Sequence, residues 1–206
     1  EKIFIDRTIE TYPELTHLSA LRGERINFQI ATTYVTKGSP MPYIAPKYTP
    51  KLSGELAKYA DLRQVMYVPV NFTTHMLGFD DNYLKTEPGL YPDLLQPMQM
   101  NNGAPVMQGP LRTVWVDIDA SKLADGEHNI TFVLNDWDHT QEIPFKLNVI
   151  PAELPEVDFP VTQWFHYDCL ATYYNVPVFS ERHWEIVENF IKTFVKCGNN
   201  TLLTPV

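Results

Sequence analysis

Three side chains near the end of the sequence have the types and the spacing to recognise a sugar. Trp164, His166 and Asp168 follow one another at intervals of two within Val161 to Leu170, an aromatic-rich segment predicted to be a strand. Residues two apart on a strand point to the same face, so the three side chains would share one face. An indole plane suits the apolar face of a sugar ring, and an imidazole and a carboxylate suit its hydroxyl groups. A buried His–Asp pair under an aromatic lid fits the same pattern equally well, and both interpretations remain open.

A helix and a second strand follow this segment and would position it. Ser180 is placed to cap a helix that Gly198 ends, and Glu181 lies where the helix dipole favours a negative charge. Leu202 and Leu203 begin another strand. Apolar residues recur at helical spacing on one predicted face, namely Trp184, Val187, Ile191, Phe194 and Val195. The order strand, helix, strand predicts one βαβ unit, whose parallel strands need a larger sheet than these residues supply.

The first 150 residues have the alternation of antiparallel sheets. Apolar and polar residues alternate from Arg25 to Ala31, and again in three runs between Leu111 and Ile150. We expect these three runs to form an antiparallel meander within a β-sandwich of about seven or eight strands. Residues 78–110 are expected to be largely irregular, and PGLYPDLL within them is expected to be a rigid loop.

The connector from Ile150 to Pro155 is flanked by prolines and predicts a domain boundary. We assign residues 1–152 to the sandwich and residues 153–206 to a second domain. The predicted fold class is therefore mainly β, an antiparallel β-sandwich followed by a single βαβ unit.

Bulk properties exclude several kinds of partner. The formal net charge is −9, so nucleic acid and an anionic membrane are not expected to bind, whereas a neutral sugar remains compatible. Cys169 and Cys197 are too few for a disulfide framework and lack the spacing of metal ligands. No run of about 18 apolar residues occurs, so no membrane-spanning helix is predicted. The cellular compartment is not indicated by the sequence.

Other polar clusters have simpler explanations than catalysis. Asp80, Asp81 and Asn82 lack the remaining ligands of a calcium loop, and residues 136–139 have the composition of a turn. The sequence contains no GxSxG, Walker, GxGxxG or HExxH motif. We predict no catalytic residue, no metal site and no cofactor within these residues.

Several motifs together resemble the N-terminal part of glycoside hydrolase family 123-like proteins, some of which are known only as domains of unknown function. The segments that carry the resemblance are GERINFQIA, PGLYPDLLQP, PLRTVWVDID, DGEHNITFVL and the stretch from WFHYDCLA to NNTLLTP. The resemblance implies a β-sandwich followed by a (β/α)8 barrel, with Val161 to Tyr174 as its first strand, Ser180 to Cys197 as its first helix and residues 200–206 as its second strand.

The same resemblance implies a chemistry and a set of contacts. Such enzymes act on N-acetylhexosaminides by a retaining mechanism in which the acetamido oxygen of the substrate attacks the anomeric carbon. An adjacent Asp–Glu pair assists, and in the family it lies further along the barrel, so no catalytic residue is transferred to this sequence. Sites in barrels form at the carboxyl ends of strands. The implied substrate contacts are His166, Asp168, Tyr173 and Thr204, with Trp164 lying deeper.

On this basis we expect the 206 residues to be the non-catalytic start of a longer glycoside hydrolase that binds an N-acetylhexosamine-containing glycan. The alternative is a carbohydrate-binding or purely structural β-sandwich module without enzymatic activity. A first barrel helix normally packs between several strands, so its apolar stripe needs a cover. We expect that cover to be a second copy of the chain, giving a homodimer through this helix, or the sandwich.

Overall fold

The structure is a computed structural model, and it describes residues 2–6, 16–33, 49–72, 83–101, 104–106, 111–135 and 140–203. The chain divides into two compact units, Glu1–Leu154 and Pro155–Val206, and each is described by itself. No helix in the described ranges has the length and the apolar character needed to cross a membrane.

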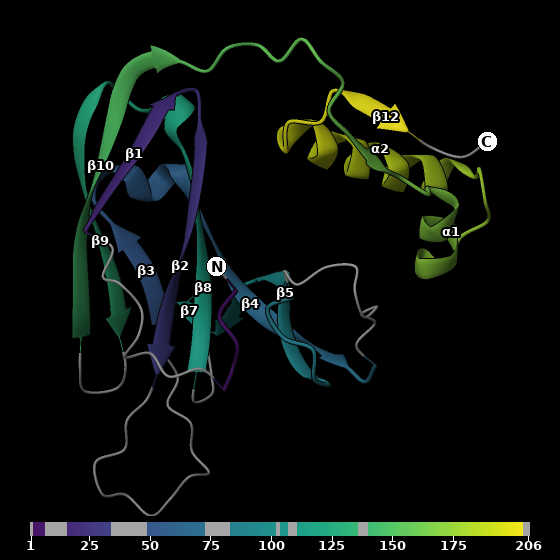
Figure 1. The fold of residues 1–206 in the computed structure, drawn as a ribbon, viewed down its shortest axis with the longest axis horizontal. Helices are drawn as coiled ribbons and strands as arrows, with labels where there is room; N and C mark the ends of the chain where they lie inside the picture. Colours follow the sequence, from purple (N-terminus) through teal and green to yellow (C-terminus); the bar gives the residue numbers. More distant parts are fainter. Residues whose placement is uncertain are drawn as a thin grey trace, which may run out of the picture. The chain divides into compact units, whose positions relative to one another are not determined.

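The first unit contains two four-stranded sheets (Figure 1). In one sheet the strand order is β1 (His17–Arg22), β10 (Thr140–Glu153), β9 (Gly126–Asn135) and β3 (Thr49–Ser53). In the other the order is β2 (Arg25–Thr33), β8 (Leu111–Asp119), β4 (Ala60–Val70) and β5 (Gly89–Pro97). A short hairpin of β6 (Gln99–Asn101) and β7 (Ala104–Val106) completes the described strands. Pairing is antiparallel throughout, except that β1 pairs parallel with β10. The predicted β-sandwich is confirmed.

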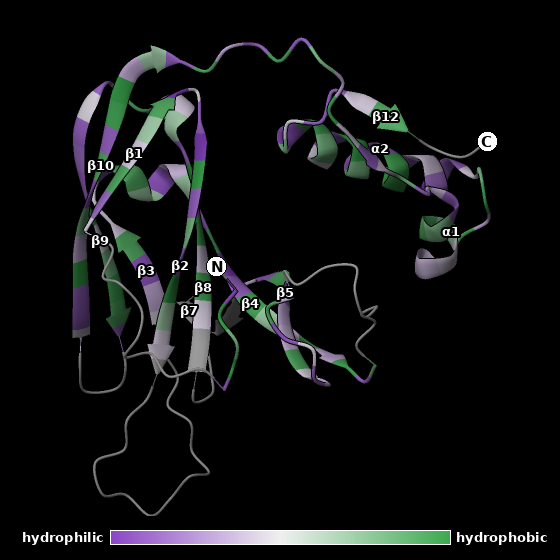
Figure 2. Cartoon of the chain, viewed as in Figure 1, coloured by the Kyte–Doolittle hydropathy of each residue, from purple (hydrophilic) through white to green (hydrophobic). Residues whose placement is uncertain are grey.

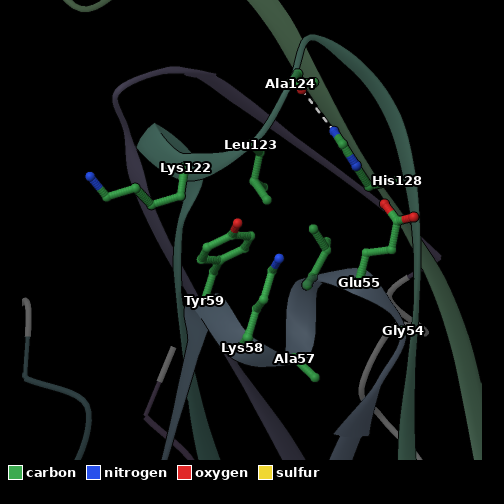
Figure 3. A pocket seen from close by; sticks show the side chains of 10 residues that line it. Gly54, Glu55, Ala57, Lys58, Tyr59, Lys122, Leu123, Ala124 and His128 are labelled. Atoms are coloured by element: carbon green, nitrogen blue, oxygen red, sulfur yellow. Dashed lines mark hydrogen bonds between the residues drawn. The ribbon is translucent and has the colours of Figure 1, made fainter.

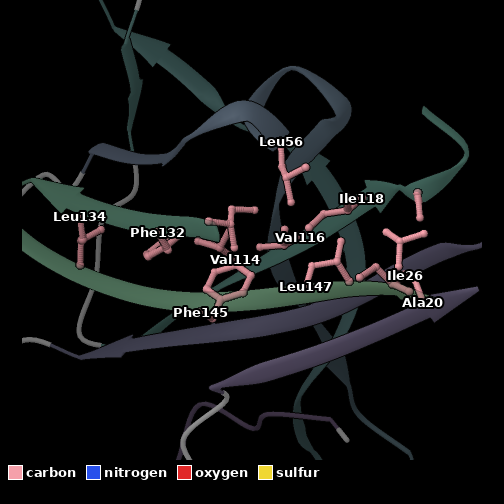
Figure 4. Packing of buried hydrophobic residues seen from close by; sticks show 13 residues of the cluster. Ala20, Ile26, Leu56, Val114, Val116, Ile118, Phe132, Leu134, Phe145 and Leu147 are labelled. Carbon is pink, nitrogen blue, oxygen red and sulfur yellow. The ribbon is translucent and has the colours of Figure 1, made fainter. Parts of the chain in front are cut away.

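Inward-facing side chains of both sheets form one core (Figure 4). Phe28 of β2 meets Phe145 of β10 edge to face, with ring centroids 5.1 Å apart, so the two sheets are in direct contact. The largest fully buried apolar side chains are Phe132, Leu56, Ile118, Ile130 and Leu147. Burial of each such side chain contributes about 1.5–3 kcal/mol. Alternation of apolar and polar residues along the strands is visible in Figure 2 and explains why each sheet buries one face.

The predicted three-stranded meander is wrong, because the chain changes sheets after its first strand. β8 pairs with β2 and β4, whereas β9 pairs with β10 and β3. The 3-10 helix η3 (Ala120–Lys122) makes this change, and its buried Ala120 donates its backbone N–H to the Glu24 carbonyl over 2.9 Å. Each strand therefore shows the predicted alternation of apolar and polar residues, but this alternation does not determine to which of the two sheets the strand belongs.

PGLYPDLL is not a loop. All of its residues after Pro88 belong to β5, which pairs with β4 along its whole length. The register shifts where Tyr67 lies opposite Pro92 and Met66 lies opposite Leu94, so Asp93 is an extra residue in a bulge. Pro92 has no N–H to donate, and an edge strand with a bulge tolerates that loss.

The second unit is a βαβ unit with one additional helix. β11 (Thr162–Trp164) pairs in parallel with β12 (Thr201–Leu203), and α1 (Asp168–Tyr174) and α2 (Glu181–Lys196) lie between them in sequence. The parallel pairing predicted from the sequence is confirmed. The first strand is shorter than predicted, because it ends at Trp164 and the chain enters α1 at Asp168.

α2 begins and ends at the residues that the sequence predicted. The Ser180 hydroxyl accepts the His183 N–H, and Gly198 adopts a positive φ of 86° just beyond the helix. The buried face differs from the predicted stripe. His183, Ile186 and Val187 are buried, whereas Trp184 is 50% exposed.

We predict that Asp119 stabilises the sandwich through its cap on η3. Its carboxylate accepts the Ser121 N–H over 3.1 Å and lies 3.3 Å from an Arg25 guanidinium nitrogen. The hydrogen bond from the Ser121 hydroxyl is the main reason why the pKa of Asp119 lies below its usual value. Asp119→Ala should lower the free energy of unfolding at pH 7 by about 1 kcal/mol, measured by urea denaturation.

The difference between wild type and variant should also depend on pH. A lowered pKa in the folded state means that the stabilisation is complete above the unfolded pKa of about 4 and is lost as the pH falls through the folded value. Asp61→Ala is the matched control, since Asp61 pairs with Arg63 at the exposed surface and should change stability by less than about 0.5 kcal/mol. Equal effects of the two substitutions would contradict the role of Asp119.

Candidate substrate-binding surface

The carboxyl ends of β11 and β12 meet at one edge of the two-stranded sheet. Trp164 lies opposite Leu203 in the register, and the Phe165 N–H donates to the Leu203 carbonyl over 2.9 Å. Both strands therefore release their chains at the same edge, where side chains from separate segments can converge. Thr204, a predicted contact, lies outside the described residues.

The two faces of this sheet have different surroundings. Phe165 is 6% exposed and packs against Phe190 and Phe194 of α2, with ring centroids 6.2 and 5.0 Å apart. Successive residues point to opposite faces, so Trp164 points away from α2, as does its register partner Leu203. Trp164 is 75% exposed and Leu203 is 43% exposed. We call this side, with Trp164, Leu203 and the adjoining His166, the open face.

The structure brings two of the predicted contacts together. The rings of Trp164 and His166 stack at 6.4 Å between centroids and 16° between planes. Together they present an apolar plane and a polar ring edge, a combination that can contact both a sugar ring and its hydroxyl groups. Trp164 is 75% exposed and Tyr173 is 82% exposed, and the expectation that Trp164 lies deeper than the other contacts stays a prediction.

Asp168 and Tyr173 lie in the helix α1 and not on the predicted strand. Asp168 is the first residue of α1, and Tyr173, in the same helix, is 82% exposed and meets Tyr174 edge to face at 5.0 Å. The prediction that His166 and Asp168 lie on one face of a strand is therefore wrong. Since β11 ends at Trp164, the spacing of two no longer fixes the relative direction of their side chains. Among the described contacts, none joins Asp168 or Tyr173 to the Trp164–His166 pair.

A residue that the sequence analysis did not single out holds this region together. His183 is fully buried, and its Nε2 donates to the Tyr167 carbonyl over 2.8 Å. Its Nδ1 accepts the Phe179 N–H over 3.0 Å, which fixes the proton on Nε2. Tyr167 directly precedes α1, and Ser180 caps α2, so the imidazole connects the starts of both helices. A histidine in the first turn of an amphipathic helix gives no sequence signal of this role.

Phe179 explains why that connection is needed. Its φ is 61°, in the left-handed region that a bulky residue seldom adopts. Such a backbone costs about 1–3 kcal/mol and persists only where its surroundings hold it. The hydrogen bond to His183 and the stacking of Phe179 on Trp184, at 5.7 Å and 21°, provide that support. The chain can then turn sharply from the end of α1 into α2.

Hydrogen bonds lower the pKa of several carboxyl groups among the described residues. Among the described residues, every carboxyl group whose pKa departs clearly from its usual value has a lowered pKa. In the second unit the pKa of Glu188 is lowered by its hydrogen bond to Lys192. A general acid of a glycosidase needs the opposite, a raised pKa. Within the described ranges no three His, Cys, Asp or Glu residues gather closely enough to hold a metal ion.

The fold and the open face define the chain as a mainly β protein in which a β-sandwich precedes a short parallel α/β unit. Comparisons with known proteins relate it to a family. Residues 164–206 match the sequence profile of "Glycoside hydrolase 123, catalytic domain". Among solved structures, a family 123 glycoside hydrolase from Clostridium perfringens, described for its hydrolysis of glycolipid glycans, is similar with a TM-score of 0.70 and 15% sequence identity. The resemblance to family 123 is therefore confirmed.

The coverage and the sequence identity of these matches limit what they show about this chain. The match covers 92% of this chain but 33% of the Clostridium perfringens enzyme, so the chain spans a third of that protein. At 15% identity the similarity concerns the fold. The ASH/PapD-like domain 7 of human CEP192 also aligns, with a TM-score of 0.29, 8% identity and coverage of 73% of this chain and 99% of that domain. No curated protein matched the chain.

We predict that His183 determines the rigidity of the second unit. His183→Leu should leave the Phe179 N–H and the Tyr167 carbonyl without their partner and cost about 1–3 kcal/mol. Native-state hydrogen exchange should show the Phe179 amide exchanging about tenfold faster or more, as 1.4 kcal/mol corresponds to a factor of ten.

Arg182→Ala is the matched control on the same helix. It removes an exposed pair with Glu185, and should change stability by less than about 0.5 kcal/mol. Unchanged protection of the Phe179 amide in His183→Leu would show that the imidazole does not hold the turn.

Proposed function

We propose that the chain is the substrate-binding start of a glycoside hydrolase acting on N-acetylhexosaminides. Residues 1–152 form the supporting sandwich in this proposal, and residues 153–206 form the first strand, helix and second strand of a (β/α)8 barrel. The observation that carries it is the open face, since the stacked Trp164 and His166 lie at the carboxyl edge of a parallel sheet. The match of residues 164–206 to the family 123 catalytic domain supports it.

The geometry gives each proposed contact a task. In a closed barrel the face away from the outer helices points inward, and here that face carries Trp164. The indole would receive the apolar face of a sugar ring, while the His166 imidazole would exchange hydrogen bonds with its hydroxyl or acetamido groups. Asp168 and Tyr173 would extend the contact from α1, and Thr204 from the end of β12.

The chemical step is proposed to use groups outside these residues. In the family that the chain resembles, the acetamido oxygen of the substrate attacks the anomeric carbon, and an adjacent Asp–Glu pair orients the amide and protonates the leaving group. The handling of substrate and the chemistry would then reside on different strands of one barrel, as is common for this architecture. The 206 residues should bind glycan without hydrolysing it.

The proposal is tested by binding and activity measurements on the 206-residue chain. Isothermal titration with chitotetraose, an N-acetylhexosamine tetrasaccharide, should show saturable binding. Trp164→Ala should weaken that binding about tenfold or more, because an aromatic anchor is removed. The 4-nitrophenyl glycosides of N-acetylglucosamine and N-acetylgalactosamine should remain intact.

Phe159→Ala is the matched control, since Phe159 is also a largely exposed aromatic residue of the second unit but precedes β11. It should leave the affinity for chitotetraose unchanged at the open face. Equal loss in both variants, or no effect of Trp164→Ala, would count against the open face as the binding surface. Release of 4-nitrophenol by the purified chain would contradict the division of binding and chemistry.

A further inference from the structure

The sandwich has a hollow that the proposed function does not use. Its volume is about 540 Å³, and it lies between the 3-10 helix η2 (Glu55–Tyr59) and the segment from Lys122 to His128 (Figure 3). Its lining side chains include Glu55, Lys58 and Tyr59 on one wall and Leu123 and His128 on the other. Both apolar and polar groups therefore face the same space.

The walls of the hollow are fixed by the core beneath them. Leu56 is fully buried and anchors η2. Gly54 precedes η2 with a φ of 101°, and a Cβ at this position would lie 3.0 Å from the Asn129 carbonyl oxygen, so this approach to β9 requires glycine. On the opposite wall, the ring nitrogen Nε2 of His128 bonds to the Ala124 carbonyl over 2.7 Å. A rigid surface of this kind loses little entropy when a ligand binds.

Three charged side chains line the hollow, namely Glu55, Lys58 and Lys122. The Lys58 ammonium lies 4.7 Å from the centroid of the Tyr59 ring, a cation–π contact that keeps it beside the hollow. In Figure 3 this ammonium points into the hollow, and the Glu55 carboxylate lies toward His128. Within the described part of the chain, no ion pair joins Glu55 or Lys58 to any residue. The Lys58 ammonium and the Glu55 carboxylate therefore remain available to a ligand, and the Lys122 ammonium also lines the hollow.

These groups select the chemistry of a ligand. A simple anion would meet the Glu55 carboxylate, and a simple cation would meet the Lys58 ammonium, so neither suits both walls. A neutral saccharide offers hydroxyl groups that accept from Lys58 and donate to Glu55. Its apolar ring face can pack on Tyr59 and Leu123, as pockets combine an apolar lining with a few polar groups.

We propose that this hollow is a second saccharide-binding site, on the sandwich, for a neutral sugar unit. Lys58 and Glu55 bond to its hydroxyl groups, and Tyr59 provides the apolar contact. The inference does not require the catalytic role proposed above, because it rests on the first unit alone.

The test is an NMR titration of the 206-residue chain with chitotetraose, observing both units at once. Amides of residues 54–59 and 122–128 should shift and saturate, as should the Trp164 indole N–H. Tyr59→Ala and Lys58→Met should each weaken binding at the hollow about tenfold and leave the Trp164 response unchanged. Tyr59→Phe keeps the ring and should retain binding within about threefold.

Each outcome decides between the two proposals. Shifts at the hollow that disappear in Tyr59→Ala support the second site, whether or not Trp164 responds. A response of Trp164 alone overturns the second site and leaves the open face standing. Shifts at the hollow that persist in both Tyr59→Ala and Lys58→Met overturn it as well, because the named side chains would not be making the contact. Spectra that keep their dispersion in the variants confirm that the fold is intact.

Discussion

Parallel pairing of β11 with β12 is the constraint on which the second unit depends. Parallel neighbours need a crossover, and α2 supplies it by packing Phe190 and Phe194 onto Phe165. Because one face of the sheet is taken by the helix, the alternation along β11 directs Trp164 to the other face. Exposure of an indole on that face follows from the fold, and recognition of a sugar is its proposed use.

The segments that surround the open face are held in place by hydrogen bonds that no sequence motif indicates. His183 uses both ring nitrogens to join the Tyr167 carbonyl to the Phe179 N–H, and the strained backbone of Phe179 depends on it. The start of α1, where Asp168 lies, is thereby tied to the start of α2. The sandwich has a comparable device, in which Asp119 caps η3 where the chain leaves one sheet for the other. Both are polar contacts at points where the chain changes direction.

Much of the fold could be predicted from local pattern, since the strands of the sandwich alternate and α2 has its Ser180 cap and its Gly198 end. The pairing between strands could not be predicted in the same way, because the alternation of residues along β8 is the same whether β8 pairs with β9 or with β2. PGLYPDLL was mistaken for a loop because its prolines suppress the strand signal, although a bulged edge strand accommodates them. At the site, the spacing of Trp164 and His166 was enough to predict that the two side chains lie together. The position of Asp168 could not be predicted, because it depends on where β11 ends.

A crystal structure of the 206-residue chain with chitotetraose is the most direct test of the central claim, that the open face recognises a sugar. We predict electron density for a sugar ring parallel to the Trp164 indole, with one of its polar groups in hydrogen-bonding distance of the His166 imidazole. Density for the saccharide that touches neither side chain, at concentrations that saturate binding in solution, would contradict the account.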